Sequence, residues 1–383
     1  MALFAFGLSI AFAHYVDKDV YGNYRFLLSL FWTLTAFTLT GLPAALTRAV
    51  AKGQEGTFRA AFGISLRWST PMLLIAAAGS AYYFLQGNET LGSGLAVIAL
   101  LGPLMQGAYL YGSYLEGRRA FRENALAGIA MGGIPAVALL ISMLFIHEPA
   151  LFLAVNLGTT VVVGFGISLI ALRFYKPPAG SATTEFSRLS GHFSVMNVLS
   201  TISQQVDRLL VFHYLGAVEL ALYSFAAAVP DQMKNLFGNA SVVAMPKFVQ
   251  RSLKEIRATL VYRVSLFTAL ALVAAITYII FAPWFFHTFF PNYVDSIFLS
   301  QLYALTLVPV GNMIPLAVLE AHAEKKKLYA FNIISPLVQI GALFIGVLGF
   351  GLIGVVVARI ASRAFNLVFL MVLAMYSGAR TAS

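Results

Sequence analysis

Eight polar or charged side chains lie inside three long apolar stretches of the sequence: Asn197, Gln204, Asp207, Arg208, Asp231, Lys234, Arg359 and Arg363. Spacings of three and four residues within each stretch place them on one face of a helix. A charge at the centre of a membrane helix costs about 2.5 to 3.5 kcal/mol, so the six charged residues would cost on the order of 15 to 20 kcal/mol if they faced lipid. This cost exceeds a typical folding stability. These side chains must therefore face one another or a water-filled cavity.

The set contains four cations and two anions, and its net positive charge favours an anionic ligand over a cationic one. Arg359 and Arg363 are four residues apart, so both lie on one face of a helix that has no acid of its own. A planar guanidinium group can hold phosphate oxygens by paired hydrogen bonds. We therefore expect these two arginines to bind a pyrophosphate, with four further residues lining the same cavity: Arg208, Lys234, Gln204 and Asn197.

Asp207 and Asp231 are the carboxylates of this set, and either could bind a coupling ion, H+ or Na+. The alternative is a structural role in ion pairs. Asp231 and Lys234 are three residues apart on one helix, whereas Asp207 could pair with Arg208 or with an arginine of a neighbouring helix. The sequence leaves these alternatives open.

Metal sites and catalytic groups find little support in the sequence. It contains no cysteine, and its six histidines lie far apart without a zinc-binding spacing. The expected outer loops bring together neither two carboxylates nor a histidine with a nucleophile. We expect no metal, no cofactor and no enzymatic activity.

The composition indicates an all-α integral membrane protein. Its 383 residues are 60% hydrophobic and 10% charged, with a mean hydropathy of +0.83, whereas soluble domains carry about 25% charge. Apolar segments of the length that a bilayer requires predict about twelve transmembrane helices, near residues 1–15, 24–46, 66–86, 94–115, 124–146, 150–172, 193–215, 218–245, 259–288, 297–319, 328–348 and 351–376.

Lysine and arginine concentrate in every second loop between these segments. Because cytoplasmic loops hold such an excess, this pattern places both termini in the cytoplasm. The formal charge of +10 therefore reflects topology. The basic residues form no single patch of the kind that binds nucleic acid, so we expect no nucleic-acid partner.

The two halves of the sequence align without a gap over residues 14–48 and 213–247, where Tyr24 falls on Tyr223. Six spans per half is an even number, so both halves insert in the same orientation, as in transporters built from parallel repeats. Phe193 at the start of the seventh segment aligns before Met1, so we expect the chain to begin inside its first helix.

This duplication predicts two six-helix bundles. The N-terminal bundle covers 1–175 and the C-terminal bundle covers 193–383. Residues 176–192 between them have the proline, glycine, serine and threonine content of a flexible cytoplasmic linker.

Several short motifs occur in a characteristic order along the chain: Asp19 to Tyr24, Gly41 to Arg48, Ser194 to Asn197, Gln205 to Val211, Tyr214 to Gly216, Leu222 to Ser224 and Pro246 to Phe248. On these motifs the sequence resembles the Wzx-type polysaccharide flippases of the multidrug, oligosaccharidyl-lipid and polysaccharide exporter superfamily. Members often have fourteen helices and a longer amino-terminal segment, and this sequence departs from them in both respects.

The resemblance implies two bundles around a central cavity that work by alternating access. It also implies a cargo, an undecaprenyl-pyrophosphate-linked oligosaccharide, which crosses the bacterial inner membrane for O-antigen, capsule or exopolysaccharide synthesis. The implied partners are this cargo, membrane lipids and other polysaccharide-assembly proteins.

Two other functions fit part of the pattern. A multidrug exporter of the same superfamily shares the twelve-helix design, but we would expect acids to dominate its cavity. A membrane polymerase or ligase of the same pathway would need catalytic groups on the outer loops, which hold few polar residues here. Flippase activity is therefore the main prediction.

The absence of cysteine allows a direct test of topology. Single cysteines near residues 18, 89, 148 and 293 should react with an impermeant thiol reagent in intact cells, because the basic loops predict that these positions face outward. Cysteines near 120, 180, 255 and 325 should not react. Labelling at 180 would contradict the division into two bundles.

Overall fold

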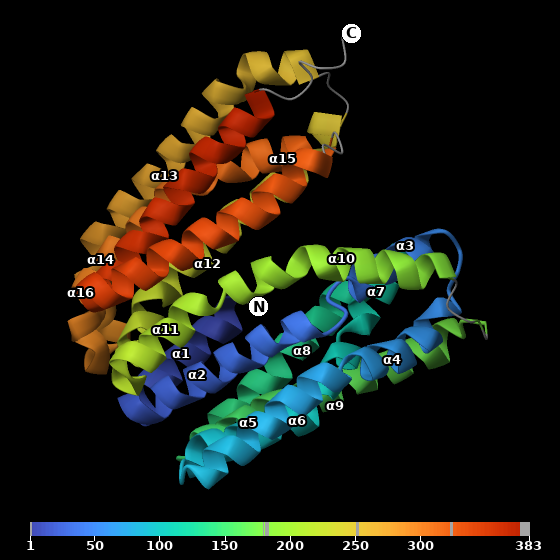
Figure 1. Cartoon of the computed structure of the whole chain (residues 1–383), viewed down its shortest axis with the longest axis horizontal. Coiled ribbons are helices and arrows are strands. Elements are labelled where there is room, and N and C mark those ends of the chain that lie inside the picture. Colours follow the sequence, from blue (N-terminus) through green and yellow to red (C-terminus); the bar gives the residue numbers. More distant parts are fainter. Residues whose placement is uncertain (1, 179, 181–183, 250–252, 322–324, 376–383) are drawn as a thin grey trace. The chain divides into compact units, whose positions relative to one another are not determined.

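Figure 1 shows the computed structural model, which describes residues 2–178, 180, 184–249, 253–321 and 325–375. Every regular element in these ranges is a helix, and this confirms the all-α prediction. Contacts between residues divide the chain into two units, Met1–Gln205 and Val206–Ser383. Each unit is described by itself.

The first unit contains ten α-helices and one short 3-10 helix within the described residues. In chain order they are α1 (Ala2–Tyr15), α2 (Lys18–Leu34), η1 (Thr35–Phe37), α3 (Leu42–Ala51), α4 (Thr57–Trp68), α5 (Thr70–Leu85), α6 (Glu89–Ala108), α7 (Leu110–Gly117), α8 (Phe121–Ser142), α9 (Pro149–Tyr175) and α10 (Thr184–Ser203). A buried apolar core forms where α3, α4 and α7 meet, and the rings of Phe58 and Tyr114 stack there with centroids 4.3 Å apart.

The second unit contains longer helices and two 3-10 segments within its described residues. They are α11 (Val206–Leu215), α12 (Ala217–Val249), α13 (Leu253–Phe289), η2 (Pro291–Ser296), α14 (Ile297–Ala304), η3 (Leu305–Asn312), α15 (Met313–Ala321) and α16 (Lys325–Met375). Residues of α13, α15 and α16, among them Val264, Val318 and Leu370, form its buried apolar cluster.

The helices account for all twelve predicted membrane segments. Seven described helical stretches are long and apolar enough to cross a membrane, and the bent pair Lys18–Phe37 with Leu42–Ala51 makes an eighth. The stretch Lys326–Met375 holds two predicted segments, because non-helical dihedral angles at Gly351 interrupt it. The three remaining predicted segments, 1–15, 193–215 and 218–245, are helical as well, although they are not among the stretches that are long and apolar enough to be counted as spans. They correspond to α1, to α10 with α11, and to α12. The chain is therefore a multi-pass membrane protein.

The sharp bend between α2 and α3 has a local cause. The chain turns by 58° around the sequence Gly41-Leu42-Pro43, and α10 lies against the turn. The Gly41 amide donates a hydrogen bond of 2.9 Å to the Ser194 hydroxyl, and a Cβ at Gly41 would overlap that of Phe193. Because α10 packs against this turn, the boundary between the units, as defined by residue contacts, falls after α10, at Gln205. The second bundle predicted from the sequence instead begins at residue 193, inside α10. The evolutionary division into halves stays a prediction.

The tyrosines aligned by the internal repeat occupy similar positions in the two units. Tyr24 is buried in the first unit and accepts a hydrogen bond of 2.8 Å from Asn156 on α9. Tyr223 is buried in the second unit and donates a hydrogen bond to Asp207, which binds Arg359 on α16. In both units polar contacts therefore link the tyrosine to a long helix that lies far from it in the sequence, α9 in the first unit and α16 in the second.

Gly351 provides a test of how the break inside α16 is made. Its φ of 58° and ψ of −137° lie in a region that only glycine adopts readily, and a side chain there costs about 1 to 3 kcal/mol. Gly351→Ala should lower the free energy of unfolding by that amount, measured by thermal unfolding in detergent. Gly349→Ala is the control, because a Cβ meets nothing within 4 Å at either position but φ is positive only at Gly351. Equal stability of the two variants would contradict this account.

Candidate functional site

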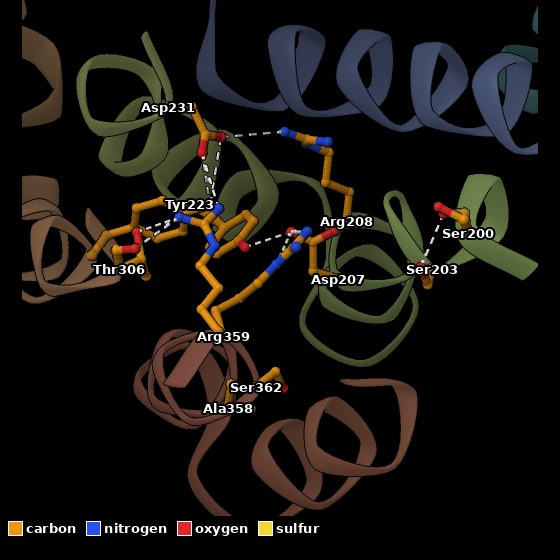
Figure 2. Close-up of polar contacts among 12 residues, drawn as sticks. Ser200, Ser203, Asp207, Arg208, Tyr223, Asp231, Thr306, Ala358, Arg359 and Ser362 are labelled. Atoms are coloured by element: carbon orange, nitrogen blue, oxygen red, sulfur yellow. Dashed lines mark hydrogen bonds and ion pairs between the residues drawn. The ribbon is translucent and has the colours of Figure 1, made fainter. Parts of the chain in front are cut away.

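The carboxylate of Asp207 lies at the centre of a polar network inside the second unit. Its side chain is fully buried, at 0% exposure. The Oδ2 atom accepts hydrogen bonds from the Tyr223 hydroxyl at 2.5 Å and from Arg359 Nε at 3.1 Å, and Arg359 Nη2 lies 2.5 Å from the same oxygen (Figure 2). A charge this deeply buried is stable only when it is paired and hydrogen-bonded. Asp207 is therefore committed to Arg359 in this structure.

Asp231 forms the second acidic position of the network, and it is more accessible. Its side chain is 29% exposed. Arg363 Nη2 lies 3.3 Å from Oδ1, and Arg208 Nη2 lies 3.9 Å from Oδ2, a distance beyond hydrogen-bonding range. The Tyr303 hydroxyl donates to the same carboxylate at 3.3 to 3.4 Å. Asp231 is thus shared between two arginines, and Arg363 lies at the shorter distance.

Aromatic and 3-10 elements hold the arginines in place. Arg363 lies over the Tyr303 ring, 5.7 Å from its centroid, and Tyr303 packs edge-on against Tyr223. Arg363 Nη1 also donates to the hydroxyl and the carbonyl of Thr306, at 2.7 and 3.3 Å. In a 3-10 helix the carbonyl of Thr306 would accept from the residue three positions later. That residue is Pro309, which has no N–H, so the guanidinium group supplies the donor.

Lys234 differs from the three arginines. It follows Asp231 by three residues on α12, is half-buried, and makes no hydrogen bond or ion pair with a described residue. It lies among the charges of Arg363, Asp231, Arg359 and Arg208. The pairing of Asp231 with Lys234 that the sequence left open is therefore replaced by pairing with arginines of other helices.

The structure brings together six of the eight residues that the sequence singled out. Asp207 and Arg208 come from α11, Asp231 and Lys234 from α12, and Arg359 and Arg363 from α16. Asn197 lies on α10 and Gln204 in the turn that follows it, both exposed and both in the first unit, so neither belongs to this network within the second unit.

Sequence reasoning missed three members of the network. The sequence indicated Tyr223 only as the residue that aligns with Tyr24 in the internal repeat. Tyr303 and Thr306 carry no charge, so nothing distinguished them from the apolar residues around them. Arg359 and Arg363 have no acid on their own helix, yet both bind acids of other helices. The expected surplus of positive charge persists in the structure because the network still holds four cations and two anions.

The two carboxylates should respond differently to the same substitution. Asp207→Asn leaves Arg359 buried beside a neutral group, and breaking such a pair costs about 3 to 5 kcal/mol. We expect a large loss of folded protein and of thermal stability in detergent. Asp231→Asn is the matched comparison and should cost less, because the Asp231 side chain is 29% exposed and that of Asp207 is fully buried. Normal stability of Asp207→Asn with loss of gradient-driven transport would instead assign Asp207 to ion coupling.

Comparisons with solved structures place the fold among known transporters. The chain superposes on a multidrug resistance MATE family transporter of the MOP superfamily in its inward-facing conformation, with a TM-score of 0.74 and 15% identity. The match covers 97% of this chain and 93% of that one. The lipid II flippase MurJ in its inward closed conformation matches with a TM-score of 0.70 and 15% identity, covering 97% of this chain and 85% of that one. A MOP superfamily transporter from Pyrococcus furiosus, described by the reverse polarity of its binding pocket, matches with a TM-score of 0.65 and 14% identity over 97% and 90% of the two chains.

None of the curated proteins compared with it is significantly similar in sequence. A family model described as "Polysaccharide biosynthesis protein" matches residues 1–252, well over half of the chain. The chain therefore belongs to this polysaccharide biosynthesis protein family.

Proposed function

We propose that this protein is a flippase that moves an oligosaccharide linked to undecaprenyl pyrophosphate across the bacterial inner membrane by alternating access. The observation that carries the proposal is the net positive charge of the membrane-embedded network in a member of this family. An anionic head group can neutralise that charge where hydrocarbon cannot. The fold shared with the lipid II flippase MurJ supports the same conclusion.

Multidrug export is the second candidate, because the fold is also shared with a multidrug resistance MATE family transporter. The charge of the network separates the two candidates. A cation entering beside four cationic side chains and two paired carboxylates would meet repulsion, whereas a pyrophosphate would meet attraction. The network therefore favours the anionic cargo.

The contacts also suggest an order in which the side chains meet this cargo. Lys234 makes no ion pair with a described residue, so this cation can turn to a phosphate at little cost. Arg363 and Arg359 are 14% and 11% exposed and hold shorter ion pairs. In this proposal, Lys234 receives the head group first, and Arg363 and then Arg359 join as their acids are released.

Release of the acids would link cargo to a coupling ion. When an arginine turns from a carboxylate to a phosphate, the carboxylate loses its counter-charge and gains affinity for H+ or Na+. Asp231 is the more accessible of the two carboxylates and is the first candidate. Asp207 would follow only if Arg359 moved.

The proposal is tested by what accumulates when the gene is deleted. Lipid-linked oligosaccharide should build up in the cytoplasmic leaflet, detected by extraction and by its inaccessibility to added glycosidases in intact cells. Accumulation in the periplasmic leaflet would point to a later step such as polymerisation. No change in lipid-linked sugar, together with greater sensitivity to cationic dyes, would favour drug export.

Lys234→Ala should strongly reduce surface polysaccharide in the complemented deletion strain while leaving protein abundance unchanged, because it removes a cation that no described acid holds. Asn235→Ala is the matched control, since the neighbouring side chain is exposed on the same helix. Full export by Lys234→Ala would show that this residue does not receive the head group.

A further inference from the structure

The guanidinium group of Arg363 is held by two partners of different kinds. Its Nη1 atom donates to Thr306, at 2.7 Å to the hydroxyl and at 3.3 Å to the carbonyl. Its Nη2 atom lies 3.3 Å from Oδ1 of Asp231. Dashed lines in Figure 2 lead from this one group to Thr306 and to Asp231. Arg363 therefore has a neutral anchor on one nitrogen and a charged partner on the other.

Arg359, four residues earlier on α16, is bound differently. Its Nε and Nη2 atoms both point to a single oxygen, Oδ2 of Asp207. That carboxylate is fully buried, so releasing it would leave a buried charge without its pair, which is costly. Arg363 can instead release the half-buried Asp231 and keep its contact with Thr306. Of these two arginines, Arg363 is the one suited to exchange its acid for an anion.

The anchor of Arg363 is itself fixed in the protein. Thr306 is 1% exposed and belongs to η3, which packs against α13 and α16. Pro309 has no N–H, so the Thr306 carbonyl lacks its 3-10 donor and stays available to the guanidinium group. Arg363 also lies over the Tyr303 ring, 5.7 Å from its centroid. Both contacts are neutral and remain when Asp231 takes up H+ or Na+.

We infer that Thr306 is a positioning residue of the anion site, which holds the Arg363 guanidinium group while Nη2 turns from Asp231 to a phosphate oxygen of the cargo. This inference rests on the proposed function for the identity of the anion. A guanidinium group binds phosphate through hydrogen bonds of defined geometry. An arginine that is ordered before the ligand arrives loses little further side-chain freedom on binding. Thr306 thereby raises the affinity for phosphate without touching it.

The test measures binding of undecaprenyl pyrophosphate to the purified full-length protein in nanodiscs. Thr306→Val keeps the shape of the side chain but removes the hydroxyl. It should weaken binding by about tenfold, the effect of losing one hydrogen bond to a charged group. Thr306→Ser restores a hydroxyl and should recover most of the affinity.

Thr268→Val is the matched control for removal of a buried hydroxyl next to η3. Thr268 lies on α13, and a Cβ added at Gly311 of η3 would lie 2.6 Å from its hydroxyl oxygen. That hydroxyl is buried and has no hydrogen-bond partner among the described residues. The substitution therefore removes no contact with Arg363, and the affinity should equal that of the wild type.

A second substitution separates positioning from a packing role. Asp231→Asn removes the charge that competes for Nη2 and should strengthen binding of undecaprenyl pyrophosphate. In the Thr306→Val background the same change should give a smaller gain, because the released guanidinium group is no longer held. A packing defect alone would lower the affinity by the same factor with either residue at position 231, since independent effects add.

Equal affinity of Thr306→Val and wild type would overturn the inference. So would a loss that Thr306→Ser does not recover, an equal loss in Thr268→Val, or equal gains from Asp231→Asn in the two backgrounds. If Thr306→Val does not fold, Thr306→Ala replaces it and is compared with Thr306→Ser in the same way. A wild-type protein that binds no undecaprenyl pyrophosphate would reject the proposed cargo together with the inference. Wild-type binding that does not depend on the Thr306 hydroxyl would reject the positioning role and leave the proposed function standing.

Discussion

The charge of Asp207, buried completely among apolar helices, is the constraint on which the second unit depends. A carboxylate in this position must be matched by donors and by an opposite charge. Tyr223 on α12 and Arg359 on α16 provide them. The consecutive helices α11 and α12 and the distant α16 are thereby fixed at one point, near the start of α11.

Exposure increases outward from this point along the network. Asp207 is inaccessible, Arg359 and Arg363 are slightly accessible, and Asp231 is accessible enough to share two arginines. A network with a rigid inner pair and a looser outer group can respond to an anion at its outer side without losing its inner anchor. The Thr306 carbonyl, left without a 3-10 donor by Pro309, adds a neutral partner that keeps Arg363 in place.

The two units solve the same packing problem with different chemistry. The first unit joins Tyr24 to α9 through the neutral Asn156, whereas the second joins Tyr223 to α16 through an ion pair.

The sequence by itself determined the all-helical membrane fold, because hydrocarbon requires long apolar helices and leaves a strong compositional pattern. It also determined that the charged residues of α11, α12 and α16 face protein or water, since lipid would reject them. Only the tertiary structure decided the partners. Arg359 meets Asp207 across 152 positions of sequence, and Arg363 replaces Lys234 as the partner of Asp231. Helical spacing governs contacts within one helix, whereas contacts between helices depend on how they pack.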